Sequence, residues 1–188
     1  MFILSGTSFD SNSWKPKRVF MINRIFRYSV IFILLILFQV LILNNIQISG
    51  YINPFAYILF ILILPVETAG WLILILAFLA GLIVDLFMGS AGMHASASVA
   101  AAFVRPFLLR SMAPRDGYEP EAEPSMEQYG FRWFAIYTLI IVAVHHLVLF
   151  WLEVMDISNF TGIMLRMLAS TLFSTVMILM LEYFRKGR

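Results

Sequence analysis

Asp85, Ser90 and His94 lie close together in the sequence and are the residue types that build an acyl-transfer site. In such a site a histidine takes the proton of a serine hydroxyl while an acid orients the imidazole. Ser96 and Ser98 offer two further hydroxyls, but the sequence alone places no third group that would complete a triad. Serine in a run of small residues more often serves helix packing. We therefore predict no catalytic residue and no enzymatic activity.

The other histidines do not form a metal-binding pattern. His145 and His146 are adjacent, so on a helix their side chains point about 100° apart and do not converge. The chain has no cysteine and no His-x-x-x-His or Glu-x-x-His spacing, which would place two ligands on one helix face. The sequence Gly89-Ser-Ala-Gly92 joins two apolar runs rather than a strand and a helix, so it does not form a phosphate-binding loop. We expect no metal, no cofactor and no nucleic-acid partner.

The composition explains what must position these residues. Of 188 residues, 61% are hydrophobic and only 13% are charged, and the mean hydropathy is +0.89. A water-soluble domain of this size needs far more polar surface. The sequence therefore predicts an all-α integral membrane protein.

Six apolar runs are candidates for transmembrane helices, at about 26–43, 54–66, 70–87, 93–109, 133–152 and 160–181. The second run is shorter than the ~20 residues that usually cross a bilayer, so a re-entrant segment is the alternative there. Residues 1–20 show no sustained period, and Met21 opens a basic stretch before the first run. We interpret residues 1–20 as an extension preceding a membrane domain of residues 21–188.

The distribution of positive charge predicts the topology. With six crossings, the loops at 44–53, 88–92 and 153–159 lie outside and contain no Lys or Arg. Of the 13 basic residues, 11 lie in inner segments, and Arg105 and Arg166 lie within spans. Both termini are therefore expected in the cytoplasm. The proline-containing acidic stretch 110–132 is expected to be a solvated cytoplasmic loop, with a basic cytoplasmic partner as the alternative.

Polar residues from several spans fall at one level on the outer side. Charges inside the hydrocarbon are costly, so they normally face a partner or water. One interpretation is an outer-facing pocket for a ligand or a partner protein. The other, which we favour, is pairing between helices, with Arg166 bound to Asp85 or Glu153. The residues concerned are Asp85, His94, His145, His146, Glu153 and Arg166.

The fourth run combines small residues with an arginine near its inner end. Ser98, Ala101 and Ala102 are expected on a face where another helix backbone approaches closely. Arg105 is expected to extend toward the cytoplasmic headgroups as an anchor, and Pro106 to kink the last turns.

Several of these motifs resemble the rod shape-determining protein MreD family, in forms from the Bacteroidetes-type lineage. The resemblance extends from about Met21 to the C-terminus. It is carried by Asn44-Asn-Ile-Gln-Ile-Ser-Gly-Tyr-Ile-Asn-Pro54, Leu64-Pro-Val-Glu-Thr68, Arg105-Pro-Phe107 and His145-His-Leu-x-Leu-Phe150. Its main part is Gly81-x-x-x-Asp85-x-x-x-Gly89-x-x-Gly92-Met-His94-Ala95.

The resemblance implies a multi-pass scaffold in the bacterial cytoplasmic (inner) membrane, without enzymatic activity. Proteins of this family support cell shape and lateral peptidoglycan synthesis. They bind MreC and work with MreB, RodA and a class B transpeptidase, directly or through MreC. The family is similar in fold to the S components of energy-coupling-factor transporters, six-helix bundles with a ligand pocket near the outer face. The alternative implied by that likeness is a substrate-binding subunit of a solute transporter.

Overall fold

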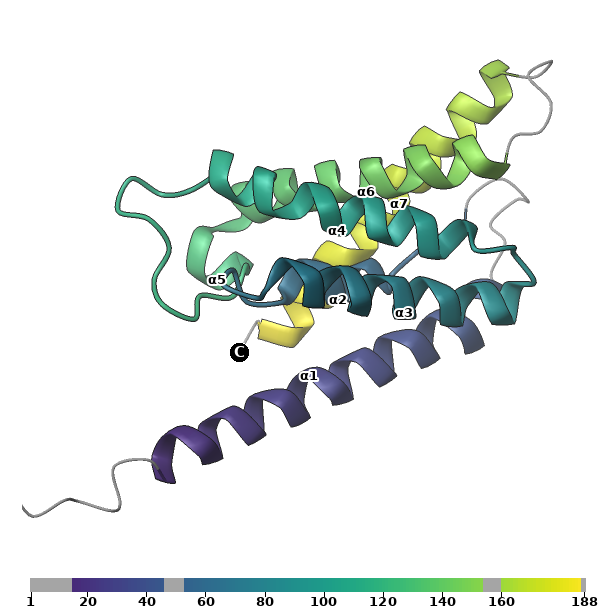
Figure 1. The fold of residues 1–188 in the computed structure, drawn as a ribbon. Helices are drawn as coiled ribbons and strands as arrows, with labels where there is room; N and C mark the ends of the chain where they lie inside the picture. Colours follow the sequence, from purple (N-terminus) through teal and green to yellow (C-terminus); the bar gives the residue numbers. More distant parts are fainter. Residues whose placement is uncertain (1–14, 46–52, 154–159, 187–188) are drawn as a thin grey trace, which may run out of the picture.

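The computed structural model describes residues 15–45, 53–153 and 160–186, and every regular element among them is helical (Figure 1). Much of the extension 1–20 and of the predicted outer loops 44–53 and 153–159 lies outside the described residues. The elements are α1 (Lys15–Leu41), a 3₁₀ turn (Leu43–Asn45), α2 (Ile58–Ile63), α3 (Gly70–Met88), α4 (Met93–Ser111), α5 (Met126–Tyr129), α6 (Phe131–Glu153) and α7 (Phe160–Lys186).

The prediction of an all-α fold is confirmed for this part of the chain, and its long apolar helices are compatible with a membrane protein. Four of its helices are long and apolar enough to cross a membrane, at Ile22–Asn45, Gly70–Met88, Phe131–Glu153 and Thr161–Lys186. The 19-residue helix α4 is not among them, because small residues and Arg105 and Arg110 lower its hydropathy. It lies along both α3 and α6 (Figure 1).

Helices α3 and α4 form a closely packed hairpin because Gly81 has no side chain. A Cβ atom built at Gly81 would lie 2.4 Å from the carbonyl oxygen of His94 and 2.5 Å from Cα of Ala95. The turn between the helices depends on a second glycine. Gly89 ends α3 with φ of 67°, a left-handed conformation that glycine adopts without steric cost, and its N–H donates to the Asp85 carbonyl.

The second predicted run is helical only from Ile58 to Ile63, which is about 9 Å of helix. Leu64 ends α2 with ψ of 144°, because the residue before a proline is pushed away from the helical conformation. All ten residues of 55–64 are buried. This segment therefore runs inside the helical bundle, where its non-helical backbone is covered by protein rather than exposed to lipid.

The segment between α4 and α6, predicted as a solvated loop, is exposed along much of its length, and part of it is folded against the bundle. Residues 113–117 are exposed, but Ala122 and Ser125 are buried. The Val66 N–H donates to the Ala122 carbonyl at 2.9 Å, and the Tyr118 hydroxyl donates to the Leu109 carbonyl at 2.6 Å. These bonds attach the connection to the ends of α2 and α4.

We predict that Gly81→Ala destabilises the hairpin by about 1–3 kcal/mol, the usual cost of overpacking, because the new methyl group would displace the backbone of α4. Thermal unfolding of the purified protein in detergent measures this. Gly70→Ala is the matched control, since a Cβ atom at Gly70 meets nothing within 4 Å. Equal unfolding midpoints for the two variants would contradict the role of Gly81.

Candidate functional site

The carboxylate of Asp85 connects the end of α3 to the beginning of α4. Its Oδ1 accepts the backbone N–H of His94 at 3.0 Å, and its Oδ2 accepts that of Ala95 at 2.9 Å. The first N–H groups of a helix have no partner within the helix, and a carboxylate also interacts favourably with the positive end of the helix dipole. Asp85 therefore caps α4 from the neighbouring helix while being only 3% exposed.

The structure brings Asp85, Ser90 and His94 together, but not in the order that a hydrolase needs. The Ser90 hydroxyl donates to Asp85 Oδ1 at 2.6 Å, and His94 Nδ1 lies 2.9 Å from the same oxygen. Ser90 Oγ is also 3.0 Å from Nδ1, so acid and hydroxyl meet the same nitrogen. In a triad they occupy opposite ring nitrogens. The Ser90 hydroxyl donates its hydrogen bond to the Asp85 carboxylate, whereas an activated serine donates to the histidine that acts as its base.

A buried aromatic side chain fills the space between the three histidines. The Phe55 ring centroid lies 5.1 Å from that of His94, 5.8 Å from that of His145 and 5.5 Å from that of His146. All four residues are less than 5% exposed. The Tyr57 hydroxyl contacts His145 Nε2 at 2.7 Å. Among the described residues, the three histidines thus lie around the Phe55 ring.

Two ring nitrogens in this region are buried and, among the described residues, have no hydrogen-bond partner: Nε2 of His94 and Nδ1 of His145. His146 is better satisfied, with Nδ1 2.9 Å from the Val142 carbonyl. Within 15–45, 53–153 and 160–186, the structure groups no three histidines, aspartates or glutamates in a way that could hold a metal ion.

Arg166 pairs with Glu153 rather than with Asp85, so the structure selects one of the two predicted partners. Its Nη1 lies 3.5 Å from Glu153 Oε1, and both side chains are about one-third exposed. Its guanidinium also lies 5.6 Å from the centroid of the Phe150 ring. Among the six predicted polar residues, Asp85 bonds His94 at the start of α4, and the three histidines surround Phe55. Glu153 and Arg166 form a separate ion pair.

Arg105 does not extend toward the headgroups, which corrects its predicted role as an anchor. It is 1% exposed. Its Nη2 donates to the Leu64 carbonyl, and its Nε donates to the Tyr137 hydroxyl at 2.9 Å. That hydroxyl donates to the Leu62 carbonyl at 3.2 Å. Carbonyls in the last turn of a helix have no partner within the helix, and Arg105 satisfies them where α2 ends. Helix α4 continues past Pro106 to Ser111.

Ser98, Ala101 and Ala102 are buried, as a packing face requires. Ser98 also has a polar role that the sequence did not indicate, since its Oγ lies 3.0 Å from the Tyr57 hydroxyl. The sequence patterns did not predict a role for Gln39. It is completely buried, and its amide bonds the Ala56 N–H at 2.8 Å and the Pro54 carbonyl at 3.1 Å. Its signal was a single polar residue inside a long apolar run.

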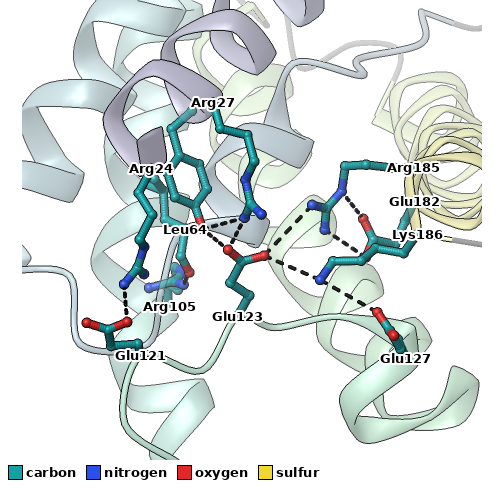
Figure 2. Close-up of polar contacts among 11 residues, drawn as sticks. Arg24, Arg27, Leu64, Arg105, Glu121, Glu123, Glu127, Glu182, Arg185 and Lys186 are labelled. Carbon is teal, nitrogen blue, oxygen red and sulfur yellow. Dashed lines mark hydrogen bonds and ion pairs between the residues drawn. The ribbon is translucent and has the colours of Figure 1, made fainter. Parts of the chain in front are cut away.

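A second polar cluster lies at the opposite end of the bundle, where α1, α7 and the α4–α6 connection meet (Figure 2). Glu123 is its centre. Its carboxylate pairs with Arg27 and accepts the Tyr28 hydroxyl at 2.5 Å. From α7, Lys186 approaches it to 3.5 Å and Arg185 to 3.9 Å.

The charges around Glu123 outweigh its burial. Burial alone would raise the pKa of the Glu123 carboxyl. The hydrogen bond from Tyr28 and the positive charges of Arg27, Lys186 and Arg185 lower it further than burial raises it, so the pKa lies below its usual 4.5. The ionised carboxylate therefore holds the connection against both terminal helices.

Comparison with known proteins identifies no relative: no protein-family model, no curated protein and no solved structure matches this chain. What can be said of function therefore rests on the residues and on their arrangement.

We predict that Asp85→Ala lowers the free energy of unfolding by about 1–3 kcal/mol for each backbone N–H left without an acceptor, and that Asp85→Asn has a smaller effect because it keeps one acceptor oxygen. Unfolding in detergent measures both. Ser96→Ala is the control: its exposed hydroxyl donates to the Gly92 carbonyl in the same turn, so a change within about 0.5 kcal/mol is expected. The cap would be disproved if Asp85→Ala were as stable as the control.

We predict that Glu123→Gln is less stable than the parent protein at pH 7 and that the difference disappears in acid. Because the folded-state pKa of Glu123 is depressed, its contribution is complete above 4.5 and is lost as the pH falls through the lower folded value. Unfolding of both proteins from pH 7 to pH 3 tests this. Glu121→Gln is the control, because its carboxylate is 55% exposed in its pair with Arg24 and exposed pairs contribute less than about 1 kcal/mol.

Proposed function

We propose that this chain is a non-enzymatic membrane scaffold of a bacterial cell-elongation complex, related to the MreD proteins. In this proposal it crosses the cytoplasmic membrane six times with both termini inside. It binds MreC, and directly or through MreC it acts with MreB, RodA and a class B transpeptidase to support cell shape and lateral peptidoglycan synthesis.

The observation that carries this proposal is the structural role of the residues in the motif Gly81-x-x-x-Asp85-x-x-x-Gly89, which carries the resemblance to the MreD family. Gly81 permits the close approach of α4, Asp85 caps that helix, and Gly89 forms the left-handed end of α3. Each of these residues has a structural task in one rigid hairpin. A motif whose residues stabilise a helical hairpin is what we expect in a scaffold, whose function is to bind other proteins.

The path of residues 53–66 supports six crossings. Phe55 contacts His94 at the first turn of α4, whereas the Leu64 carbonyl is bound by Arg105. These two positions on α4 are about 16 Å apart. The buried segment therefore advances along most of α4, and α4 is too long to lie within one leaflet, since the hydrocarbon core is ~30 Å thick.

The position of Phe55 favours a scaffold over the alternative, a substrate-binding subunit of a transporter. In the part of the chain that the structure describes, the Phe55 ring lies against His94, His145 and His146, where a solute in an outer-facing pocket lined by these histidines would need open space.

We predict that depletion of this chain in the organism that encodes it converts rods to round cells, and that the tagged protein co-purifies in detergent with the MreC of the same organism. Expression of Ser90→Ala should restore rod shape, because Ser90 supports the Asp85 carboxylate and the His94 ring, whereas Asp85 itself accepts the N–H groups of α4. Asp85→Ala should restore it poorly, in proportion to its lower accumulation in the membrane.

Unchanged cell shape after depletion, together with no recovery of MreC, would refute the scaffold. Recovery of an ATPase and its membrane coupling subunit would favour the transporter alternative. Loss of function in a stable, normally accumulating Ser90→Ala variant would instead indicate chemistry at the hairpin.

A further inference from the structure

An apolar groove of about 680 Å³ lies between α1 and the bundle, beside the contact of Phe32 with Phe60. Its volume is within the roughly 300–1,000 Å³ typical of ligand sites. Its walls come from three helices, so it is not a dimple on one helix surface. Its apolar lining includes Phe32 and Ile33 of α1, Phe60 of α2, and Leu72 and Leu76 of α3.

The length of the groove fits a lipid of one leaflet. Along α1 the lining residues extend from Arg24 to Ile33, a rise of about 14 Å. Half of a hydrocarbon core that is ~30 Å thick is about the same distance. A partner transmembrane helix would need a surface about twice as long, so an acyl chain is the better match.

The groove is charged at one end and apolar along the rest. Arg24 and Glu121 line it there, and they also line an adjoining polar cavity of about 380 Å³. In that cavity three basic side chains, Arg24, Arg27 and Lys186, outnumber two carboxylates, Glu121 and Glu123, and the amides of Asn23 and Gln128 add hydrogen-bond donors. Figure 2 shows how these charged side chains converge from α1, α7 and the connection.

We propose that this groove binds one phospholipid with an anionic headgroup. The acyl chain lies against Phe32, Phe60 and Leu76, and the phosphate lies beside Arg24, which is 23% exposed in its pair with Glu121 and so remains partly accessible. Arg is well suited to this contact because its fork of N–H donors matches phosphate oxygens. The lipid would fill the space between α1 and the bundle independently of any partner protein.

The test measures lipid retained by the purified full-length chain after equilibration with phosphatidylglycerol and phosphatidylcholine of identical acyl chains. Native mass spectrometry should detect one bound lipid, with phosphatidylglycerol favoured by about five-fold, the factor that one basic residue contributes near an anionic group. Ile33→Trp should abolish retention by filling the groove. Leu34→Trp is the matched control: Leu34 is 59% exposed against 55% for Ile33, it is the next residue on α1, and it does not line the groove.

Arg24→Gln should retain one lipid but lose the preference for phosphatidylglycerol, whereas Arg110→Gln, which removes an exposed charge outside the groove, should keep it. Equal retention by Ile33→Trp and Leu34→Trp would overturn the site. Equal retention of the two lipids by the parent protein would overturn its charge selectivity. Displacement of the lipid when MreC co-purifies would also overturn the proposal, because it would assign the groove to a partner helix. Thermal unfolding of each variant distinguishes lipid loss from misfolding.

Discussion

Every backbone N–H and C=O inside a membrane-embedded bundle must have a hydrogen-bond partner in the protein, because the hydrocarbon contains no water to bond it. This protein breaks its helices at three places where that requirement is severe: the α3–α4 turn and the two ends of α2. Buried polar side chains meet it at each place. Asp85 takes two N–H groups of α4, Gln39 and Ser174 bond the extended backbone before α2, and Arg105 takes carbonyls after it.

This requirement changes how the polar residues are interpreted. A carboxylate, an arginine and a serine inside an apolar chain have the appearance of a reaction centre or a ligand pocket. Here most of them are already occupied by backbone groups of a neighbouring segment. A group that holds a helix end cannot transfer a proton without releasing that end. These residues therefore have a structural role that is independent of any reaction.

The positions of the later helices could be predicted because each apolar run ends at a glycine or at a charged stretch. The run 70–87 corresponds to α3 and 93–109 to α4, within two residues. The burial of the second run was harder to predict from the sequence. Pro65 explains why α2 ends at Leu64, yet nothing local indicates that residues 55–64 are wholly enclosed. Arg105 was misplaced for the same reason: its partners are carbonyls about forty residues away in sequence.

The two ends of the bundle are built for different tasks. At the α3–α4 turn the polar groups are buried and mostly satisfied by each other or by backbone, which favours one fixed shape. At the other end Glu123 joins the connection to α1 and α7 through partly exposed ion pairs. Such pairs are weak and sensitive to salt. The half of α1 that carries Arg24 and Arg27 is therefore held less tightly than the half that contains the buried Gln39, whose amide bonds the backbone before α2. The Arg24–Arg27 half is the part of α1 that a lipid or a partner in the membrane can reposition.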